Sequence, residues 1–153
     1  MLTQGRMAPD VTLPCQDGSL LSLSQVQPAP LVLFFYSADG TRTCTGEVLA
    51  FDAAAPAFAA AGTRLFGLSR DTVATHAQFA AKHRVTVTLL ADAVGAVCEA
   101  FGVWQEKQLY GRTCMGVVRS TFLIDGTGRI ARAWTHVRLK GHVETVLAAA
   151  QAL

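Results

Sequence analysis

Cys44 is the residue whose position in this sequence most favours chemistry. The apolar run 31–36 ahead of it predicts a strand buried on both faces, and the alanine-rich run from Val48 onward predicts a helix. Cys44 therefore lies in the polar segment 37–47, near the start of a helix. Free backbone N–H groups, the helix dipole and the charge of Arg42 favour a thiolate there. Such a thiolate is a nucleophile for a small electrophile, whereas the alternative is a small buried side chain without chemistry.

Five short motifs surround or follow this cysteine. They are Phe35-Tyr36-x-x-Asp39-x-Thr41-x-x-Cys44-Thr45-x-Glu47, Ser69-Arg70-Asp71, Tyr110-Gly111-x-x-x-Met115-Gly116, Arg119-Ser120-Thr121-Phe122-Leu123-Ile124-Asp125 and Val137-x-x-Lys140-Gly141-His142. In this order they resemble the peroxiredoxins of the AhpC/TSA family, and among them the bacterioferritin comigratory protein or Q-type group. The resemblance covers almost the whole chain. It implies a thiol-dependent peroxidase that reduces hydrogen peroxide and organic hydroperoxides through a sulfenic acid at Cys44.

A peroxidase site must keep the sulfur ionised, hold both peroxide oxygens in line and stabilise charge on the leaving oxygen. The resemblance implies that Thr41, Cys44 and Arg119 form this catalytic group. From the residues alone, Thr41 either hydrogen-bonds to the sulfur or the peroxide, or only caps the helix. Arg119 either supplies a buried positive charge that needs an anionic partner, or is exposed on an edge strand.

Tyr36, Thr43 and Glu47 are expected to support this group. Backbone N–H groups around Thr43 and Cys44 can bind a peroxide oxygen. Glu47, one turn after the cysteine, either orients the arginine or only favours the helix start through its charge. No spacing typical of a nucleophile–base pair or of metal ligands occurs among the histidines, which are His76, His83, His136 and His142. We expect surface or packing roles for them, and neither a cofactor nor a metal.

The sequence departs from the family pattern on both sides of the active loop. Ser37 stands where a proline usually follows the tyrosine, and Arg42-Thr43 replaces the usual Pro-Gly before the cysteine. A proline restricts the loop and removes an N–H group, so Ser37 changes the freedom of the pocket or its donors. We expect these departures to affect the rate of the reaction more than its type.

The second thiol that must resolve the sulfenic acid is missing from its usual places. In this group it commonly lies five residues after the first cysteine or in the helix after the second strand. Those places hold Leu49 and, in the later helix, Ala80 and Ala81. Three routes stay open: an external thiol, which we rank first, then Cys98 on the next helix, then Cys114 in a mobile loop.

Size and composition fit one domain over residues 1–153, with 51% hydrophobic residues. No apolar run approaches the roughly 18 residues of a membrane span, and the N-terminus lacks the apolar core of a secretory signal, so we expect a cytoplasmic protein. A net charge of +2 with scattered basic residues argues against nucleic acid. The expected partners are a peroxide and thioredoxin, glutaredoxin or a small thiol. We expect a monomer, with a dimer as the alternative.

The pattern along the chain predicts an α/β, thioredoxin-like fold: a mixed central sheet flanked by helices, with an N-terminal β-hairpin. The hairpin is expected over 11–23, around a two-residue Asp17-Gly18 turn. After the strand 31–36, the first helix runs towards residue 62, kinked or divided at Pro56. Asp71 is expected to cap the second helix and Asp92 to begin the third. Further strands are expected over 64–69, 85–90, 117–124 and 129–137, and a closing helix over 141–153.

Residues 104–116 form the longest polar stretch. We expect an irregular loop there, with Tyr110 and Met115 as apolar lids.

Two other functions compete with the peroxidase. The first is a redox-sensing or interaction protein on the same scaffold, in which Cys44 is oxidised once and not recycled; the missing second cysteine keeps this interpretation open. The second is a cysteine hydrolase, which the sequence supports poorly because no recognisable motif places a histidine.

Overall fold

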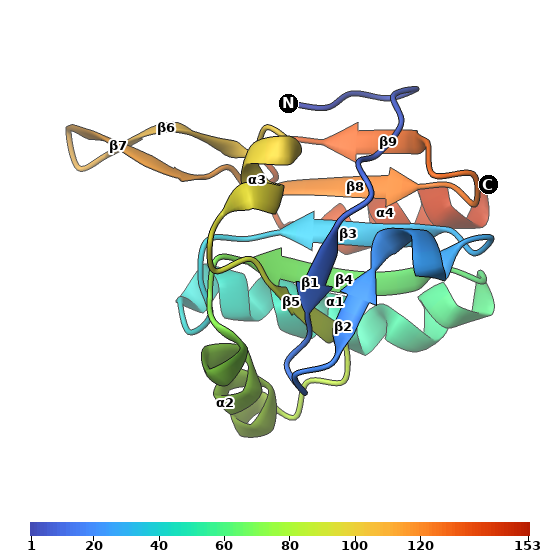
Figure 1. The fold of residues 1–153 in the computed structure, drawn as a ribbon, viewed down its shortest axis with the longest axis horizontal. Coiled ribbons are helices and arrows are strands. Elements are labelled where there is room, and N and C mark those ends of the chain that lie inside the picture. The colour runs from blue at the N-terminus through green and yellow to red at the C-terminus, as the bar shows by residue number, and fades with distance from the viewer.

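The computed structural model describes residues 1–153, apart from the side chain of Leu109. Its centre is a five-stranded mixed sheet in the order β5-β4-β3-β8-β9 (Figure 1). The strands are β3 (Leu31–Phe35), β4 (Arg64–Ser69), β5 (Thr88–Ala91), β8 (Ser120–Ile124) and β9 (Ile130–Trp134). Strands β3, β4 and β5 are parallel, β8 is antiparallel to β3, and β9 is antiparallel to β8. The expected thioredoxin-like arrangement is confirmed.

Strand β3 is buried on both faces, as its apolar sequence predicts. Its alternate side chains contribute to two separate cores. On one face, Val32 and Phe34 pack against α1 (Arg42–Ala60) and α4 (His142–Gln151). Those two helices lie behind the sheet in Figure 1. Residues 36–41 lead from the end of β3 into the first turn of α1, so Cys44 lies at the carboxyl edge of the sheet.

The other face of the sheet is covered by short elements. Figure 1 shows the hairpin of β1 (Thr12–Pro14) and β2 (Leu20–Ser22) in front of the sheet. The 3₁₀ helix η1 (Leu23–Val26) and α3 (Ala96–Ala100) pack on this face as well. Helix α2 (Val73–His83) packs near the edge formed by β5. No helix in the described chain is long and apolar enough to cross a bilayer.

The N-terminal hairpin is confirmed, but its connection is longer than a two-residue turn. Five residues join the strands. Within this connection, the Cys15 amide donates to the Ser19 carbonyl, and the Gly18 amide donates to the Cys15 carbonyl. The carboxylate of Asp17 accepts hydrogen bonds from both the backbone and the hydroxyl of Ser19. This local bonding by an aspartate side chain replaces the expected tight turn.

The prediction of an irregular loop over 104–116 is wrong. The segment forms a regular hairpin of β6 (Trp104–Leu109) and β7 (Arg112–Val117), which projects from the body of the molecule (Figure 1). Tyr110 and Gly111 join the strands with φ angles of 52° and 74°, the positive values that a tight hairpin turn requires. The side chain of Tyr110 is 96% exposed and Met115 is 49% exposed, so neither forms a lid.

Several predicted boundaries shift. Helix α1 starts at Arg42, ahead of the alanine-rich run, because Thr41 provides its cap. Pro56 does not divide it. Helix α2 is capped by the hydroxyl of Thr72 and not by Asp71. Asp92 accepts from the backbone N–H groups of residues 97 and 98, so that α3 starts at Ala96, four residues later than predicted.

Three predicted strands differ in their bounds from the strands of the structure. Strand β5 begins three residues after the predicted start at Val85. The predicted strand 117–124 is interrupted, since β7 ends at Val117 and β8 begins at Ser120. Arg119 lies in this interruption, directly before β8. The last strand ends at Trp134, three residues before the predicted end.

Candidate active site

Cys44 lies in the first turn of α1, where the chain has just left the carboxyl end of β3. Thr41 is the N-cap residue of the helix, and its hydroxyl oxygen accepts a hydrogen bond from the Cys44 amide at 3.2 Å. The cysteine is 2% exposed. The cap thus fixes both the start of the helix and the position of the sulfur, while the neighbouring residues 41–43 remain exposed.

Arg119 reaches this cysteine from a distant part of the sequence. Its Nη2 donates a hydrogen bond to the Cys44 Sγ over 3.2 Å, across a separation of 75 residues. The register of the sheet explains the meeting, because Phe35 at the end of β3 pairs with Ser120 at the start of β8. Arg119 is partly buried and belongs to no edge strand, and it lies against the anionic partner that a buried guanidinium needs.

Glu47 is the second partner of Arg119. Its Oε1 accepts a hydrogen bond from Nη1 at 2.5 Å, and its side chain is fully buried. The arginine is therefore held between a sulfur and a carboxylate on the same helix. Of the two interpretations of Glu47, the structure agrees with the one in which it contacts the arginine.

The surroundings of Cys44 favour its ionised form. Burial is the strongest single influence and raises the pKa of the thiol, but hydrogen bonds from the Thr41 hydroxyl, the Ala38 amide and Arg119 oppose it, together with the charge of Arg119. These contributions outweigh burial and bring the pKa of Cys44 below its ordinary value. The surroundings of the sulfur thus favour the thiolate over the thiol even though water has little access to it.

Two opposing influences act on the ionisation of the Glu47 carboxyl. Burial raises the pKa of its carboxyl to about 7, although the charge and hydrogen bond of Arg119 act in the opposite direction. Its second oxygen, Oε2, is buried and has no hydrogen-bond partner among the described residues. Burial also works against the charged form of Arg119, but Glu47 and Cys44 outweigh it and raise the pKa of the guanidinium.

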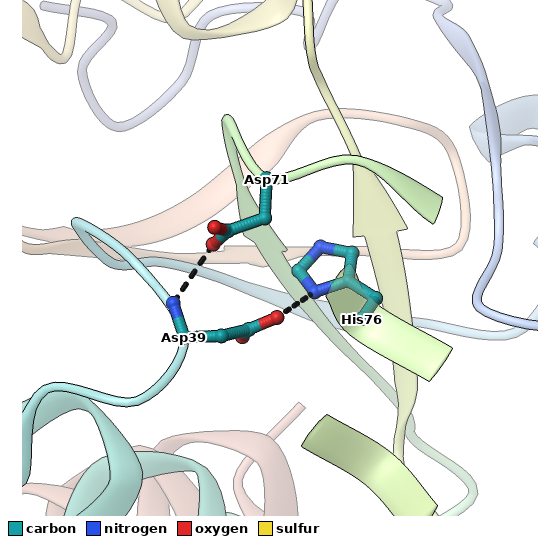
Figure 2. A group of neighbouring side chains, drawn as sticks. All are labelled: Asp39, Asp71 and His76. Carbon is teal, nitrogen blue, oxygen red and sulfur yellow. Dashed lines mark hydrogen bonds and ion pairs between the residues drawn. The ribbon is translucent and has the colours of Figure 1, made fainter. Parts of the chain in front are cut away.

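A second polar group lies beside the active loop (Figure 2). The Tyr36 hydroxyl donates to Oδ1 of Asp39 at 2.7 Å, and burial raises the pKa of this tyrosine. The Asp39 backbone N–H donates to Oδ2 of Asp71 at 2.8 Å, and Oδ2 of Asp39 lies 2.6 Å from Nδ1 of His76. This contact was not expected, because only a surface or packing role was predicted for His76 from the sequence. The available signal was indirect: Asp39 and Asp71 both belong to motifs that follow a buried strand.

This group is also the set of side chains in the described chain best placed to hold a metal ion. One ligand atom from each of Asp39, Asp71 and His76 lies within 4.8 Å of the others. The carboxylate oxygens and the imidazole nitrogen already take part in hydrogen bonds with one another or with neighbouring donors. These contacts join the three side chains in one hydrogen-bonded network.

All four cysteines are free thiols, and the other three differ from Cys44 in their surroundings. Cys98 is fully buried, and burial followed by its hydrogen bond with Asp92 raises the pKa of its thiol. Cys114 is exposed on β7, where it lines a cavity together with Ser37 and Trp104. Cys15 is buried, and burial raises the pKa of its thiol as well.

Comparison with known proteins agrees with this arrangement. The sequence model described as the AhpC/TSA family matches residues 4–133. Peroxiredoxin Bcp of Xanthomonas campestris pv. campestris is 40% identical over 143 residues, which cover 94% of this chain and 89% of that protein. Peroxiredoxin Bcp of Bacillus subtilis is 38% identical, covering 94% of this chain and 91% of its own.

A solved structure of peroxiredoxin Q from Xanthomonas campestris superimposes with a TM-score of 0.92 and 37% identity, over 99% of each chain. The family match leads to the same conclusion as the sequence identity and the shared structure. The chain belongs to the AhpC/TSA family, as a Bcp or Q-type peroxiredoxin, and is a thiol-dependent peroxidase.

Proposed function

We infer that Cys44 is the residue that attacks the peroxide, with Arg119 and Thr41 as its catalytic partners. The observation that carries this assignment is the 3.2 Å contact between Nη2 of Arg119 and Sγ of Cys44. A guanidinium fixed against a sulfur whose pKa is lowered provides both the nucleophile and a positive charge for the leaving oxygen. The remaining cysteines have no such partner among the described residues.

In the proposed step, the thiolate of Cys44 attacks one peroxide oxygen while the O–O bond breaks. Sulfur gains that oxygen and becomes a sulfenic acid, and the other oxygen leaves with the bonding electron pair and takes up a proton to become water or an alcohol. The Arg119 guanidinium stabilises the negative charge that develops on the leaving oxygen. The Thr41 hydroxyl orients the sulfur or the peroxide, and the Thr43 backbone N–H, in the unpaired first turn of α1, binds an oxygen.

The substrates would be hydrogen peroxide and organic hydroperoxides. A related Xanthomonas campestris bacterioferritin comigratory protein, 39% identical with a TM-score of 0.88 over 93% of this chain and 90% of its own, has been solved in connection with alkyl peroxide reduction. Attack on an O–O bond requires only that the two oxygens lie in line with the sulfur. The substituent on the leaving oxygen lies outside that line, so the same group of residues can act on both kinds of peroxide.

An external thiol is the proposed route for returning Cys44 to its reduced state. Cys98 is buried in the core and its raised pKa makes it a poor nucleophile, so it is less suited to resolution than its position on the next helix suggested. Cys114 is exposed, but it lies on a strand and not in a mobile loop. Thioredoxin, glutaredoxin or a small thiol would act on a monomer.

The test is peroxide consumption by the wild type, Cys44→Ser and Cys15→Ser in the presence of thioredoxin with its reductase, glutaredoxin or dithiothreitol. We expect Cys44→Ser to abolish turnover and Cys15→Ser to retain it. After one equivalent of peroxide, mass spectrometry should locate one added oxygen on Cys44. Equal rates for the wild type and Cys44→Ser would refute the assignment. Oxidation of Cys44 without repeated turnover under any reductant would instead favour the redox-sensing interpretation.

A further inference from the structure

The loop that joins β3 to α1 is held from outside by residues of the next βα unit. The backbone N–H of Asp39, in the middle of this loop, donates to Oδ2 of Asp71, and the hydroxyl of Ser69 donates to the same oxygen at 2.5 Å. Figure 2 shows Asp71 and His76 directed towards Asp39 from the segment that follows β4. The active loop is therefore tied to the start of α2 through polar contacts.

His76 makes the second tie, and each of its two ring nitrogens has a hydrogen-bond partner. Nε2 lies 3.0 Å from the carbonyl oxygen of Leu90, which can only accept a hydrogen bond, so Nε2 carries a hydrogen. Nδ1 lies 2.6 Å from Oδ2 of Asp39. A contact this short between a nitrogen and a carboxyl oxygen needs a proton between them. The imidazole thus bridges β5 and the active loop.

Burial makes this bridge difficult to replace by water. The side chain of His76 is fully buried and that of Asp39 is 3% exposed. An unmade hydrogen bond in such a place leaves a polar group without a partner and costs the full desolvation of that group. The loop therefore has a single favourable position relative to α2 and β5.

The position of Asp39 determines the positions of the catalytic residues on either side of it. Its other oxygen, Oδ1, accepts from the hydroxyl of Tyr36 at the start of the loop. Thr41, two residues later, caps α1 and hydrogen-bonds to Cys44. Any movement of Asp39 is therefore passed along a short segment of backbone to the hydroxyl that contacts the sulfur.

We propose that His76, acting through Asp39, is a positioning residue that holds the loop 36–41, and with it Thr41 and Cys44, in the geometry for attack on a peroxide. This proposal rests on the assignment of Cys44 as the attacking residue. His76 does not touch the sulfur, and its contribution is to the alignment on which in-line displacement depends. Misplacement of reacting groups by about 1 Å can lower a rate by roughly 100-fold.

Two substitutions of His76 separate its two contacts. The amide of asparagine places an N–H near the position of Nδ1, so His76→Asn can still donate to Asp39 but loses the contact with Leu90. The longer His76→Gln reaches towards the Leu90 carbonyl but withdraws the donor from Asp39. His83→Gln, on the same helix and in contact with Phe79 rather than the loop, is the matched control.

The rate constant for oxidation of Cys44 by hydrogen peroxide is measured in a single turnover, with peptide mapping to follow this cysteine alone. We expect His76→Gln to lower it by about 10-fold to 100-fold, and His76→Asn and His83→Gln to stay within about threefold of the wild type. Alkylation of Cys44 by iodoacetamide should become faster in His76→Gln, because a released loop exposes the sulfur. Parallel losses in both reactions would indicate general damage and overturn the proposal.

Asp39→Ala provides a second test if His76→Gln does not fold, since it removes the other partner of the same contact, which belongs to the loop 36–41. The same slower oxidation and faster alkylation are expected.

Wild-type oxidation rates in His76→Gln or Asp39→Ala would overturn the positioning role and leave the assignment of Cys44 intact. Failure of wild-type Cys44 to oxidise would instead overturn that assignment. A wild-type rate that falls on addition of a chelator would show that Asp39, Asp71 and His76 hold a metal, contrary to the proposal.

Discussion

The partly buried Arg119 and the fully buried Glu47 form an ion pair with a 2.5 Å contact, and the second terminal nitrogen of the same guanidinium lies 3.2 Å from the sulfur of Cys44. The carboxylate thus fixes the plane of the arginine while the second nitrogen faces the Cys44 sulfur. Breaking such a pair by removing one partner is expected to cost stability as well as activity, because the other charge is left buried alone.

Replacement of Arg119 by methionine is expected to slow the oxidation of Cys44 by about 100-fold to 1,000-fold, the range found when one donor to a developing oxyanion is lost. The same change leaves Glu47 unpaired. The double variant Arg119→Met with Glu47→Gln should therefore recover much of the lost stability without recovering the rate. Stopped-flow oxidation and urea unfolding measure the two effects separately. If the double variant regained the wild-type rate, the arginine would have only a structural role.

Thr41→Val should raise the pKa of Cys44, because the hydroxyl is one of the groups that hold it below its ordinary value. Loss of the cap should also lower the free energy of unfolding by about 1 kcal/mol. Thr41→Ser keeps the hydroxyl and should retain both properties. The pH dependence of Cys44 alkylation, followed on its own peptide, reports the pKa. Identical profiles for the valine and serine variants would contradict a role for the hydroxyl.

The stability of the fold should depend on pH through Glu47. Its pKa is about 7 in the folded chain against an ordinary value of 4.5, so the folded state binds a proton more tightly than the unfolded state between these values. The contribution of Glu47 to the free energy of unfolding should therefore be largest at low pH, decrease as pH rises through this window and level off above it. The total change is on the order of a few kcal/mol.

This dependence is isolated by comparing urea unfolding of the wild type, Glu47→Gln and the exposed control Glu99→Gln at pH values from about 5 to 8. The difference in stability between the wild type and Glu47→Gln should move in favour of the glutamine variant as pH rises. The Glu99→Gln curve should run parallel to that of the wild type. A constant difference across the range would mean that Glu47 does not titrate in it.

Turnover with an external reductant should survive the loss of either internal candidate thiol. Cys98→Ser and Cys114→Ser are each expected to keep at least about half of the wild-type rate with thioredoxin or dithiothreitol, because neither sulfur is expected to attack the sulfenic acid. A sulfenic acid trap should label Cys44 in both variants. Loss of turnover in Cys114→Ser, together with a disulfide from Cys44 to Cys114 in the wild type, would identify an internal route and contradict this expectation.

Much of the site could be predicted from the sequence because it depends on local patterns. The apolar run of β3 and the polar segment after it locate Cys44 without any tertiary information. The contact with Arg119 spans 75 residues. The residues alone left Arg119 with two alternatives, and the resemblance to a known family favoured the one in which it lies beside Cys44. The link between His76 and Asp39 gave no local signal, since it depends on how α2 packs against the active loop.

The β6–β7 hairpin was missed for a different physical reason. It projects from the sheet, and residues 112–115 of β7 are exposed, so burial does not impose on them the alternation typical of a strand. Its turn is formed by Tyr110 and Gly111, and tyrosine is an uncommon residue at a positive φ angle. The predicted third helix was too long because Asp92 was assigned as its first residue rather than as a distant acceptor for its backbone.

The pairing of Phe35 with Ser120 also means that Cys44 and Arg119 can meet only late in synthesis. Cys44 leaves the ribosome well before Arg119, and until β8 has joined the sheet no guanidinium is present beside the sulfur. If Cys44 acts as proposed, we expect the nascent chain to lack the contribution that Arg119 makes to its thiolate. Pairing of β8 with β3 would supply that contribution only once the sheet is complete.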